Sequence, residues 1–291
     1  MMPIYDRVLI TGAGGMLARA LIRALRSRGI EPVALDRAAL DITDLDQVRA
    51  AFDSSPTLVL NSAAYTKVDL AETERDRAMA VNGEALKNLS RFAQLHRAAL
   101  VHFSTDYVFD GTLTRPLRPD DRIGPRSAYG ASKRRGEEWV LTTGPDRSLV
   151  IRTAWLYGPG GPNFVQTMLN AARAGKPLKV VNDQTGSPTF THDLADATLN
   201  LIDADARGVY HVTNFGQTTW FDFTRAILDE FNVSAEVSPT TSAEWKKIRP
   251  NSAERPAYSV LDCSEYQRVT GKSLPDWRDA LHRYRLAIEH G

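Results

Sequence analysis

The chain has 291 residues, of which 43% are hydrophobic and 24% charged, and 36 Lys and Arg balance 35 Asp and Glu for a net charge of +1. This length supports one large α/β domain or two modest ones. The composition excludes a small disulfide scaffold, a globally disordered chain and a coiled-coil or collagen-like repeat. The near-zero net charge gives no general attraction to nucleic acid or to an anionic membrane, so we expect a small-molecule partner.

The cysteine count and the N-terminus bear on the cellular setting. Cys263 is the single cysteine, so the chain has no internal disulfide and lacks the thiols of a usual zinc site. The segment MMPIYDRVLITGAGG passes directly into a strand-like run without the apolar region of a signal peptide. No stretch approaches the roughly 18 apolar residues of a membrane span. We therefore expect a cytoplasmic protein without a membrane segment.

Short apolar runs alternate with amphipathic segments through the first half of the chain. We predict strands at residues 7–11, 32–36, 57–61, 99–104 and 148–153. Helices are predicted between them, at residues 16–28, 44–53, 75–95 and 129–143. This alternation is typical of βαβ units, so we predict an α/β, Rossmann-like, doubly wound parallel sheet with its site at the carboxyl ends of the strands.

The alternation becomes less regular after residue 155. We predict a helix near 163–174, strands at 178–181 and 208–212, a helix near 219–231, an irregular segment at 238–256 and a final helix at 274–287. We therefore expect a dinucleotide-binding domain at residues 1–155. Residues 156–291 are expected to form a smaller, interleaved C-terminal substrate lobe that partly returns to the main sheet.

A glycine-rich turn follows the first predicted strand. Its glycines allow the backbone to approach a pyrophosphate, and the next helix offers unpaired N–H groups and the positive end of its dipole. The spacing Gly12-x-x-Gly15-x-x-Ala18 matches the short-chain dehydrogenase variant of this motif. Asp36 lies about 20 residues further on, where it can bind the adenosine ribose, whereas Arg37 can pair with a 2′-phosphate. NAD and NADP both stay open.

A tyrosine and a lysine are spaced for catalysis in the segment Tyr129-Gly-Ala-Ser-Lys133. Residues i and i+4 share one helix face, about 5–6 Å apart at Cβ. A nearby ammonium favours the tyrosinate, so Lys133 can tune Tyr129 as an acid while it holds the nicotinamide ribose. Thr105 ends the preceding strand, where its hydroxyl can donate to a carbonyl beside Tyr129. Taken alone, the spacing fits an exposed helix face better, and the order of Thr105 and Tyr129 along the chain is what favours the catalytic interpretation.

Sequence blocks along nearly the whole chain carry a family resemblance. They are NSAAYTKVD at 61–69, STDYVFDG at 104–111, YGASK at 129–133, RTAWLY at 152–157, NDQTGSPT at 182–189, and Arg255-Pro256 with LPDW at 274–277. With these blocks the chain resembles the extended short-chain dehydrogenase/reductases and, more narrowly, the dTDP-4-dehydrorhamnose reductase family.

The resemblance implies NAD(P)H-dependent reduction of the 4-keto group of dTDP-4-dehydro-L-rhamnose, in dTDP-rhamnose biosynthesis. It implies Thr105, Tyr129 and Lys133 as the catalytic residues. Cofactor contacts are expected at Gly12, Gly15, Met16, Leu17, Asp36, Arg37, Asp41, Ile42, Ala63, Ala64, Tyr65, Tyr129 and Lys133. Substrate contacts are expected at Val68, Thr105, Tyr107, Trp155 and Arg255. Asn82 lies where related enzymes place an Asn that supports a proton relay.

One departure from the family pattern concerns metal binding. Some relatives bind Mg²⁺ through glutamates at a dimer contact, and the positions that align with two of these glutamates are Ala20 and His192. Magnesium and that dimer are therefore in doubt, and we expect no metal ligand in this chain. A monomer and a homodimer both stay open.

Two further functional hypotheses are retained from the sequence. One is a nucleotide-sugar epimerase, or another 4-ketosugar reductase, on the same scaffold. The other is a non-catalytic regulatory subunit resembling that of methionine adenosyltransferase, although the intact catalytic residues argue against it. The histidines show no metal-ligand spacing, and we interpret His102 as an ordinary surface or core residue. Trp220 and Trp245 are interpreted as packing residues of the second lobe.

Overall fold

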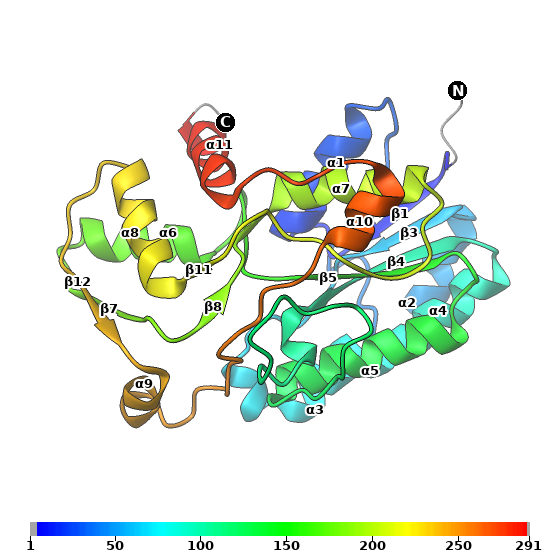
Figure 1. Cartoon of the computed structure of the whole chain (residues 1–291). Helices are drawn as coiled ribbons and strands as arrows, with labels where there is room; N and C mark the ends of the chain where they lie inside the picture. Colours follow the sequence, from blue (N-terminus) through cyan, green and yellow to red (C-terminus); the bar gives the residue numbers. More distant parts are fainter. Residues whose placement is uncertain (1–4, 290–291) are drawn as a thin grey trace.

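Apolar runs form the central sheet of the computed structural model, which describes residues 5–289 (Figure 1). The six strands lie in the order β10-β5-β4-β3-β1-β2, and every neighbouring pair is parallel. They are β1 Val8–Thr11, β2 Val33–Leu35, β3 Leu58–Asn61, β4 Ala99–Thr105, β5 Ser148–Thr153 and β10 Gly208–His211. The α/β prediction with a parallel sheet is confirmed. Because β2 and β3 lie on opposite sides of β1, the strand order reverses there, which is where open α/β sheets bind ligands.

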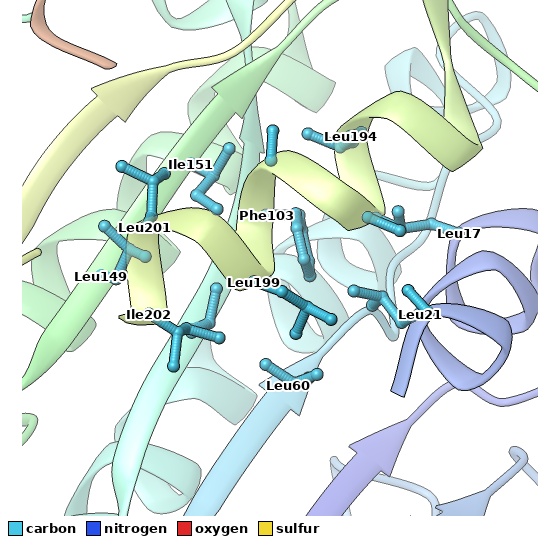
Figure 2. Close-up of a cluster of buried hydrophobic side chains, with 14 of the residues drawn as sticks. Leu17, Leu21, Leu60, Phe103, Leu149, Ile151, Leu194, Leu199, Leu201 and Ile202 are labelled. Atoms are coloured by element: carbon cyan, nitrogen blue, oxygen red, sulfur yellow. The ribbon is translucent and has the colours of Figure 1, made fainter. Parts of the chain in front are cut away.

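Helices cover both faces of this sheet (Figure 1). One face carries α1 Met16–Arg26 and α7 Thr191–Asp203, which pack against each other. Figure 2 shows side chains of α7 and α1 over apolar residues of β3, β4 and β5. The other face carries α2 Leu45–Ala51, α4 Ala85–Leu95 and α5 Ala128–Thr143.

Alternating strand residues serve these two layers. In β1, Val8 and Ile10 belong to the core under α1 and α7, whereas Leu9 packs with the residues of α2 and α4. In β4 the same alternation places Val101 on the first face and Leu100 on the second. Successive side chains of a strand point to opposite faces of the sheet. Because helices cover both faces here, both sets of side chains are apolar, and the strand sequence is continuously apolar.

The predicted helix at 75–95 is present but interrupted. It consists of α3 Arg75–Met79, the π-helical turn η3 Ala80–Glu84 and α4. The η3 turn contains Asn82, whose side chain is buried. Such π-helical turns often lie near functional sites. The helix at 44–53 ends as the 3₁₀ turn η1 Phe52–Ser54.

Beyond residue 155, α6 Phe164–Arg173, α8 Trp220–Glu230 and α11 Trp277–Glu289 share an aromatic core. β7 Leu178–Val181 pairs with β12 Val237–Thr240 beside α8 (Figure 1). In contrast, β10 pairs with β5, and α7 packs on α1. Part of the later chain thus lies with the main sheet, while the division at residue 155 stays a prediction.

The irregular segment predicted at 238–256 is wrong in its first half. It contains most of β12 and the helix α9 Ser242–Ile248. A capping box begins that helix: Thr241 Oγ1 accepts from the Glu244 N–H, and a Glu244 carboxylate oxygen accepts from the Thr241 N–H. The Thr-x-x-Glu spacing is the signal that predicts such a start.

The remaining elements were not predicted from the sequence pattern. They are α7, α10 Ser264–Thr270, β6 Leu156–Tyr157, β8 Thr185–Gly186, β9 Thr189–Phe190, β11 Thr218–Thr219, η2 Leu70–Glu72 and η4 Asp106–Val108. Most are too short to show a period. Across residues 5–289, every helix is too short or too polar to traverse a bilayer.

Candidate active site

A cavity of about 1380 Å³ opens where β1, β3, β4 and β5 end. Its wall contains all the residues that the sequence predicted for cofactor or substrate binding and all three predicted catalytic residues. The cavity therefore brings the predicted site residues together, including those that lie more than a hundred positions apart. It also contains residues of both proposed lobes, among them Trp155 and Arg255.

The glycine turn after β1 has the shape that a dinucleotide needs. Gly12 has a φ of 69°, and a Cβ at this position would lie 2.7 Å from the Ala63 backbone. At Gly14 a Cβ would meet nothing within 4 Å, so the turn faces open space. Gly15 precedes α1, and among the described residues no side chain caps this helix. The first N–H groups of α1 can therefore bind a phosphate, and these residues fit a dinucleotide cofactor.

The segment after β2 holds the groups expected near the adenosine ribose. Asp36 accepts hydrogen bonds from the N–H groups of Ala38 and Ala39, both at 3.0 Å, which fixes its carboxylate at the rim of the cavity. The Arg37 guanidinium lies 3.4 Å from the Asp41 carboxylate and is largely exposed. Hydrogen bonds from Thr43 are the main cause of the lowered pKa of Asp41, and Arg37 adds to it. Arg37 is thus only loosely held and can turn toward a phosphate.

Thr105 lies at the end of β4, where the strand turns into η4. Its hydroxyl accepts from the Tyr107 N–H at 3.2 Å and donates to the Asp106 carboxylate at 3.0 Å. Asp106 is buried, and burial raises its pKa to about 6. The Thr105 hydroxyl therefore has its oxygen fixed in place, while its proton can be given to Asp106 or to a bound carbonyl.

Tyr129 lies in the first turn of α5, the helix that completes the site. The Ser127 hydroxyl caps α5 by accepting from the Gly130 N–H at 3.1 Å. The rings of Tyr129 and Tyr107 meet edge to face, with centroids 5.8 Å apart. Burial raises the pKa of the Tyr129 phenol, with a smaller contribution from Asp106, whereas the neighbouring Thr105 hydroxyl lowers it. Tyr129 is therefore protonated at neutral pH and placed to act as an acid.

Lys133 lies one helical turn after Tyr129 and is almost completely buried. Its ammonium donates to the Phe103 carbonyl at 2.5 Å, so β4 holds the end of the side chain. Burial lowers the pKa of Lys133 to about 8, while the Glu137 carboxylate acts in the opposite direction. The group therefore changes charge much closer to neutral pH than an exposed lysine does.

Two polar residues behind the cavity wall hold this arrangement. Asn82 accepts from the Tyr65 N–H at 2.8 Å and donates to the Tyr65 carbonyl and to the Ser132 hydroxyl. It therefore ties the segment after β3 to α5. His102 lies 3.4 Å from the Lys133 nitrogen, a contact that differs from the ordinary surface or core role expected from the sequence. Its position in β4, three residues before Thr105, is the only sequence signal of this contact.

Aromatic side chains dominate the other end of the cavity. Trp155, with a left-handed φ of 47°, stacks on Trp220 at 3.5 Å between ring centroids. Trp245 also contributes to the wall. Trp220 packs in the aromatic core of the second lobe, as the sequence predicted, and both Trp220 and Trp245 also line the cavity.

Arg255 reaches the cavity from the segment that follows α9. Its guanidinium lies 2.8 Å from the Asp69 carboxylate and donates to the Ala253 carbonyl at 3.2 Å. Asp69 also accepts from the Ala253 N–H. These contacts hold the Arg255 segment against the residues that follow β3, and Val68 from that stretch and Tyr107 from η4 line the same wall.

The two positions that align with magnesium-binding glutamates of relatives are Ala20 in α1 and His192 in α7. Ala20 is buried in the core of α1, and His192 contacts the Phe190 ring. Burial, with the charge of Arg23 as the next cause, lowers the pKa of His192 to about 4. Within residues 5–289, no cluster of three or more His, Cys, Asp or Glu could hold a metal ion.

The fold and the cavity define a Rossmann-type protein of the extended short-chain dehydrogenase/reductase class. A sequence model described as the RmlD substrate binding domain matches residues 6–288. The dTDP-4-dehydrorhamnose reductase of Streptomyces griseus is 46% identical over 282 residues, covering 94% of this chain and 91% of that protein. The chain belongs to the dTDP-4-dehydrorhamnose reductase family, as its sequence blocks predicted.

Two other relatives are similar over almost the whole length. A probable dTDP-4,6-dihydroxy-2-methyloxan-3-one 4-ketoreductase of Streptomyces antibioticus is 43% identical and covers 98% of this chain and 97% of that protein. The crystal structure of a dTDP-4-dehydrorhamnose reductase from Bacillus anthracis in complex with NADP superposes with a TM-score of 0.92 at 36% identity. That match covers 98% of this chain and 100% of the other.

Proposed function

We propose that the protein is an NAD(P)H-dependent oxidoreductase that reduces the 4-keto group of dTDP-4-dehydro-L-rhamnose to give dTDP-L-rhamnose. One observation carries the proposal. A proton donor, a second hydroxyl donor and a lysine line the same cavity as a glycine turn that fits a dinucleotide: Tyr129, Thr105 and Lys133. The family relatives that carry this activity in their names support the choice of substrate.

The chemistry divides between the cofactor and the side chains. Bound NADH or NADPH supplies the hydride that reduces the sugar C4. Tyr129 gives its proton to the oxygen as negative charge develops on it, and Thr105 donates a second hydrogen bond to that oxygen. Lys133, as an ammonium, favours the tyrosinate that is left behind. A bound carbonyl competes with the Asp106 carboxylate for the Thr105 proton, because the hydroxyl has only one to donate.

A Tyr129→Phe variant tests this assignment. It removes the proton donor and keeps the ring, so we expect NAD(P)+ affinity close to wild type and a kcat reduced by about 10²–10⁴-fold. Consumption of NADH and NADPH with dTDP-4-dehydro-L-rhamnose measures kcat, and fluorescence titration measures cofactor binding. A kcat within a factor of two of the wild type would contradict the role of Tyr129.

A different dTDP-4-ketosugar substrate is the second candidate for the same site. The Streptomyces antibioticus relative, 43% identical, has a name that specifies another ketosugar. Comparison of kcat/KM for both substrates decides between them. The epimerase hypothesis predicts sugar conversion without net NAD(P)H consumption, and the regulatory-subunit hypothesis predicts no turnover with either sugar.

Two further aspects of the proposal concern the setting. We propose a cytoplasmic enzyme, which agrees with a single cysteine and with the absence of a membrane-crossing helix among residues 5–289. We also propose that the protein acts as a monomer or a homodimer, with the predicted catalytic residues of a chain lining a single cavity. Light scattering of the purified protein distinguishes the two states.

A further inference from the structure

A row of buried hydrogen bonds runs beneath the cavity from β1 to α5. The Thr11 hydroxyl donates to the Asn61 carbonyl oxygen at 2.6 Å. The Asn61 amide nitrogen lies 2.9 Å from His102 Nδ1, and His102 Nε2 lies 3.4 Å from Lys133 Nζ. All four side chains are buried. The row therefore connects the dinucleotide turn after β1 to the predicted catalytic lysine through one histidine.

The polarity of this row determines which ring nitrogen carries the proton. The Ala63 N–H donates to the Thr11 hydroxyl at 3.3 Å, so the Thr11 proton is free to be donated to Asn61. The Asn61 oxygen is then an acceptor, and its NH₂ group donates to His102 Nδ1. A neutral imidazole that accepts at Nδ1 has its proton on Nε2. Burial and the charge of Lys133 lower the pKa of His102 well below its ordinary value, so the ring is neutral.

This tautomer directs an N–H at the lysine nitrogen. An ammonium is a donor only, so it cannot accept a hydrogen bond from His102 Nε2, whereas the free amine has a lone pair that can accept one. The contact therefore stabilises the amine relative to the ammonium, in the same direction as burial. It does so in addition to the Phe103 carbonyl, which holds the side chain in place.

Among the other groups around His102 and Lys133, a single charge acts in the opposite direction and favours the ammonium. Glu137, one turn after Lys133 on α5, favours the ammonium, but it is paired with Arg152 of β5 at 2.9 Å. From β1 and β3 the facing groups are the uncharged Thr11 and Asn61. From η3 the uncharged backbone carbonyl of Asn82 abuts α5 at Gly136, where an added Cβ would also lie 3.4 Å from His102 Nε2.

We propose that His102 is a positioning residue for Lys133. The Nε2–H of His102 disfavours the ammonium form of Lys133 and so prepares Lys133 to pass a proton to the Tyr129 tyrosinate after each reduction. In that step one N–H bond of the ammonium breaks and the phenol O–H bond forms. The resulting amine accepts the hydrogen bond from His102 and later takes a proton from solvent. The inference rests on the proposed function for the step at Tyr129, but the His102 tautomer can be measured without turnover.

Nitrogen-15 NMR of the wild-type protein with labelled histidine tests the tautomer directly. We expect His102 to be neutral at pH 7 with Nε2 protonated and Nδ1 accepting a hydrogen bond. The spectrum of a His102→Phe variant assigns the signal. A proton on Nδ1, or on both nitrogens, would overturn the proposal, because Nε2 would then accept from the ammonium or the ring would be charged. This readout stands even if the protein proves to act on another substrate.

The pH dependence of kcat tests the consequence. The rate of reduction is expected to fall as pH rises through about 8, where Lys133 loses its proton. The His102→Phe variant lacks the N–H that disfavours the ammonium, so Lys133 should keep its proton to higher pH. The fall in kcat should therefore move to higher pH by about one unit. His211→Phe is the matched control, since His211 is also buried but lies two strands away in β10. An unmoved limb in folded His102→Phe, or an equal shift in His211→Phe, would reject the role.

Discussion

At the residue scale, the choice between the two cofactors depends on the pair that follows β2. Asp36 is held by two backbone N–H groups, whereas Arg37 is exposed and its guanidinium lies 3.4 Å from the Asp41 carboxylate. A 2′-phosphate can therefore recruit the Arg37 guanidinium without breaking a buried contact, and its planar fork suits a phosphate. The neighbouring Asp36 carboxylate instead suits a free ribose hydroxyl.

Replacement of Arg37 separates these contributions. In Arg37→Ala we expect KM for NADPH to rise about tenfold, equivalent to about 1.4 kcal/mol, while KM for NADH stays within a factor of two. The mutated side chain lies at the rim, so kcat with saturating cofactor should not change. Steady-state kinetics with each cofactor provide the measurement. If both KM values rise equally, Arg37 does not distinguish the phosphate.

Some residues of the cavity can be predicted from the sequence, whereas others depend on how distant segments pack together. Thr105, Tyr129 and Lys133 were predicted because strand ends and an i, i+4 spacing are visible in the sequence. His102 was not, since its relation to Lys133 depends on how α5 lies on β4, and no local pattern encodes that approach. Trp245 similarly reaches the cavity through a segment whose path the sequence leaves undefined.

At the element scale, the close approach of α5 to the turn after β4 positions the side chains that we propose as catalytic. Gly130 allows it: a Cβ there would lie 2.3 Å from the Tyr107 carbonyl oxygen. Any larger residue must therefore displace the start of α5, which carries Tyr129 and Lys133. This explains in physical terms why a glycine lies between the two functional residues of the YGASK segment.

Gly130→Ala is expected to reduce both stability and activity. The overpacked contact should cost about 1–3 kcal/mol of unfolding free energy, and misalignment of Tyr129 should lower kcat by about 10²-fold. Urea denaturation and the reductase assay measure the two effects. Gly124→Ala is the control, because a Cβ there would make only an ordinary contact of 3.4 Å with Asp110. Equal behaviour of the two variants would contradict this account.

The elements that sequence patterns revealed are those with a clear period and an exposed side. The predicted alternation of strands and helices in the first half is confirmed. It was visible in the sequence because each helix there buries one face and exposes the other. α7 shows no clear period in the sequence because nine of its thirteen residues are buried, including Thr198 and Asp193. Its exposed stripe is narrow, with Asp196 and Asp203 at the surface, and its Thr and Asp content resembles a loop. Tertiary contacts such as Asp193 with Arg283 make that content acceptable.

At the scale of the whole molecule, a net charge of +1 is compatible with an anionic ligand because the attraction is local. The glycine turn offers backbone N–H groups at the N-terminus of α1, and Arg37 and Arg255 add cationic side chains along the cavity. The wall also draws residues from α1, β5 and the segment around Gly161. A ligand that fills the cavity therefore contacts parts of the chain that are far apart in sequence, and its binding should stabilise the fold as a unit.

Thermal unfolding with and without NADP+ tests this coupling. At a concentration of 100 times Kd, ligand binding should add about 2.7 kcal/mol to the free energy of unfolding, which raises Tm by several degrees. Gly12→Val should lose the shift, measured against its own ligand-free Tm, because its side chain would press on the Ala63 backbone and deform the turn. Tyr129→Phe should keep it, since the ring remains in place. A full shift in Gly12→Val would show that NADP+ binds elsewhere, and no shift in the wild type would mean that the cavity does not bind this cofactor.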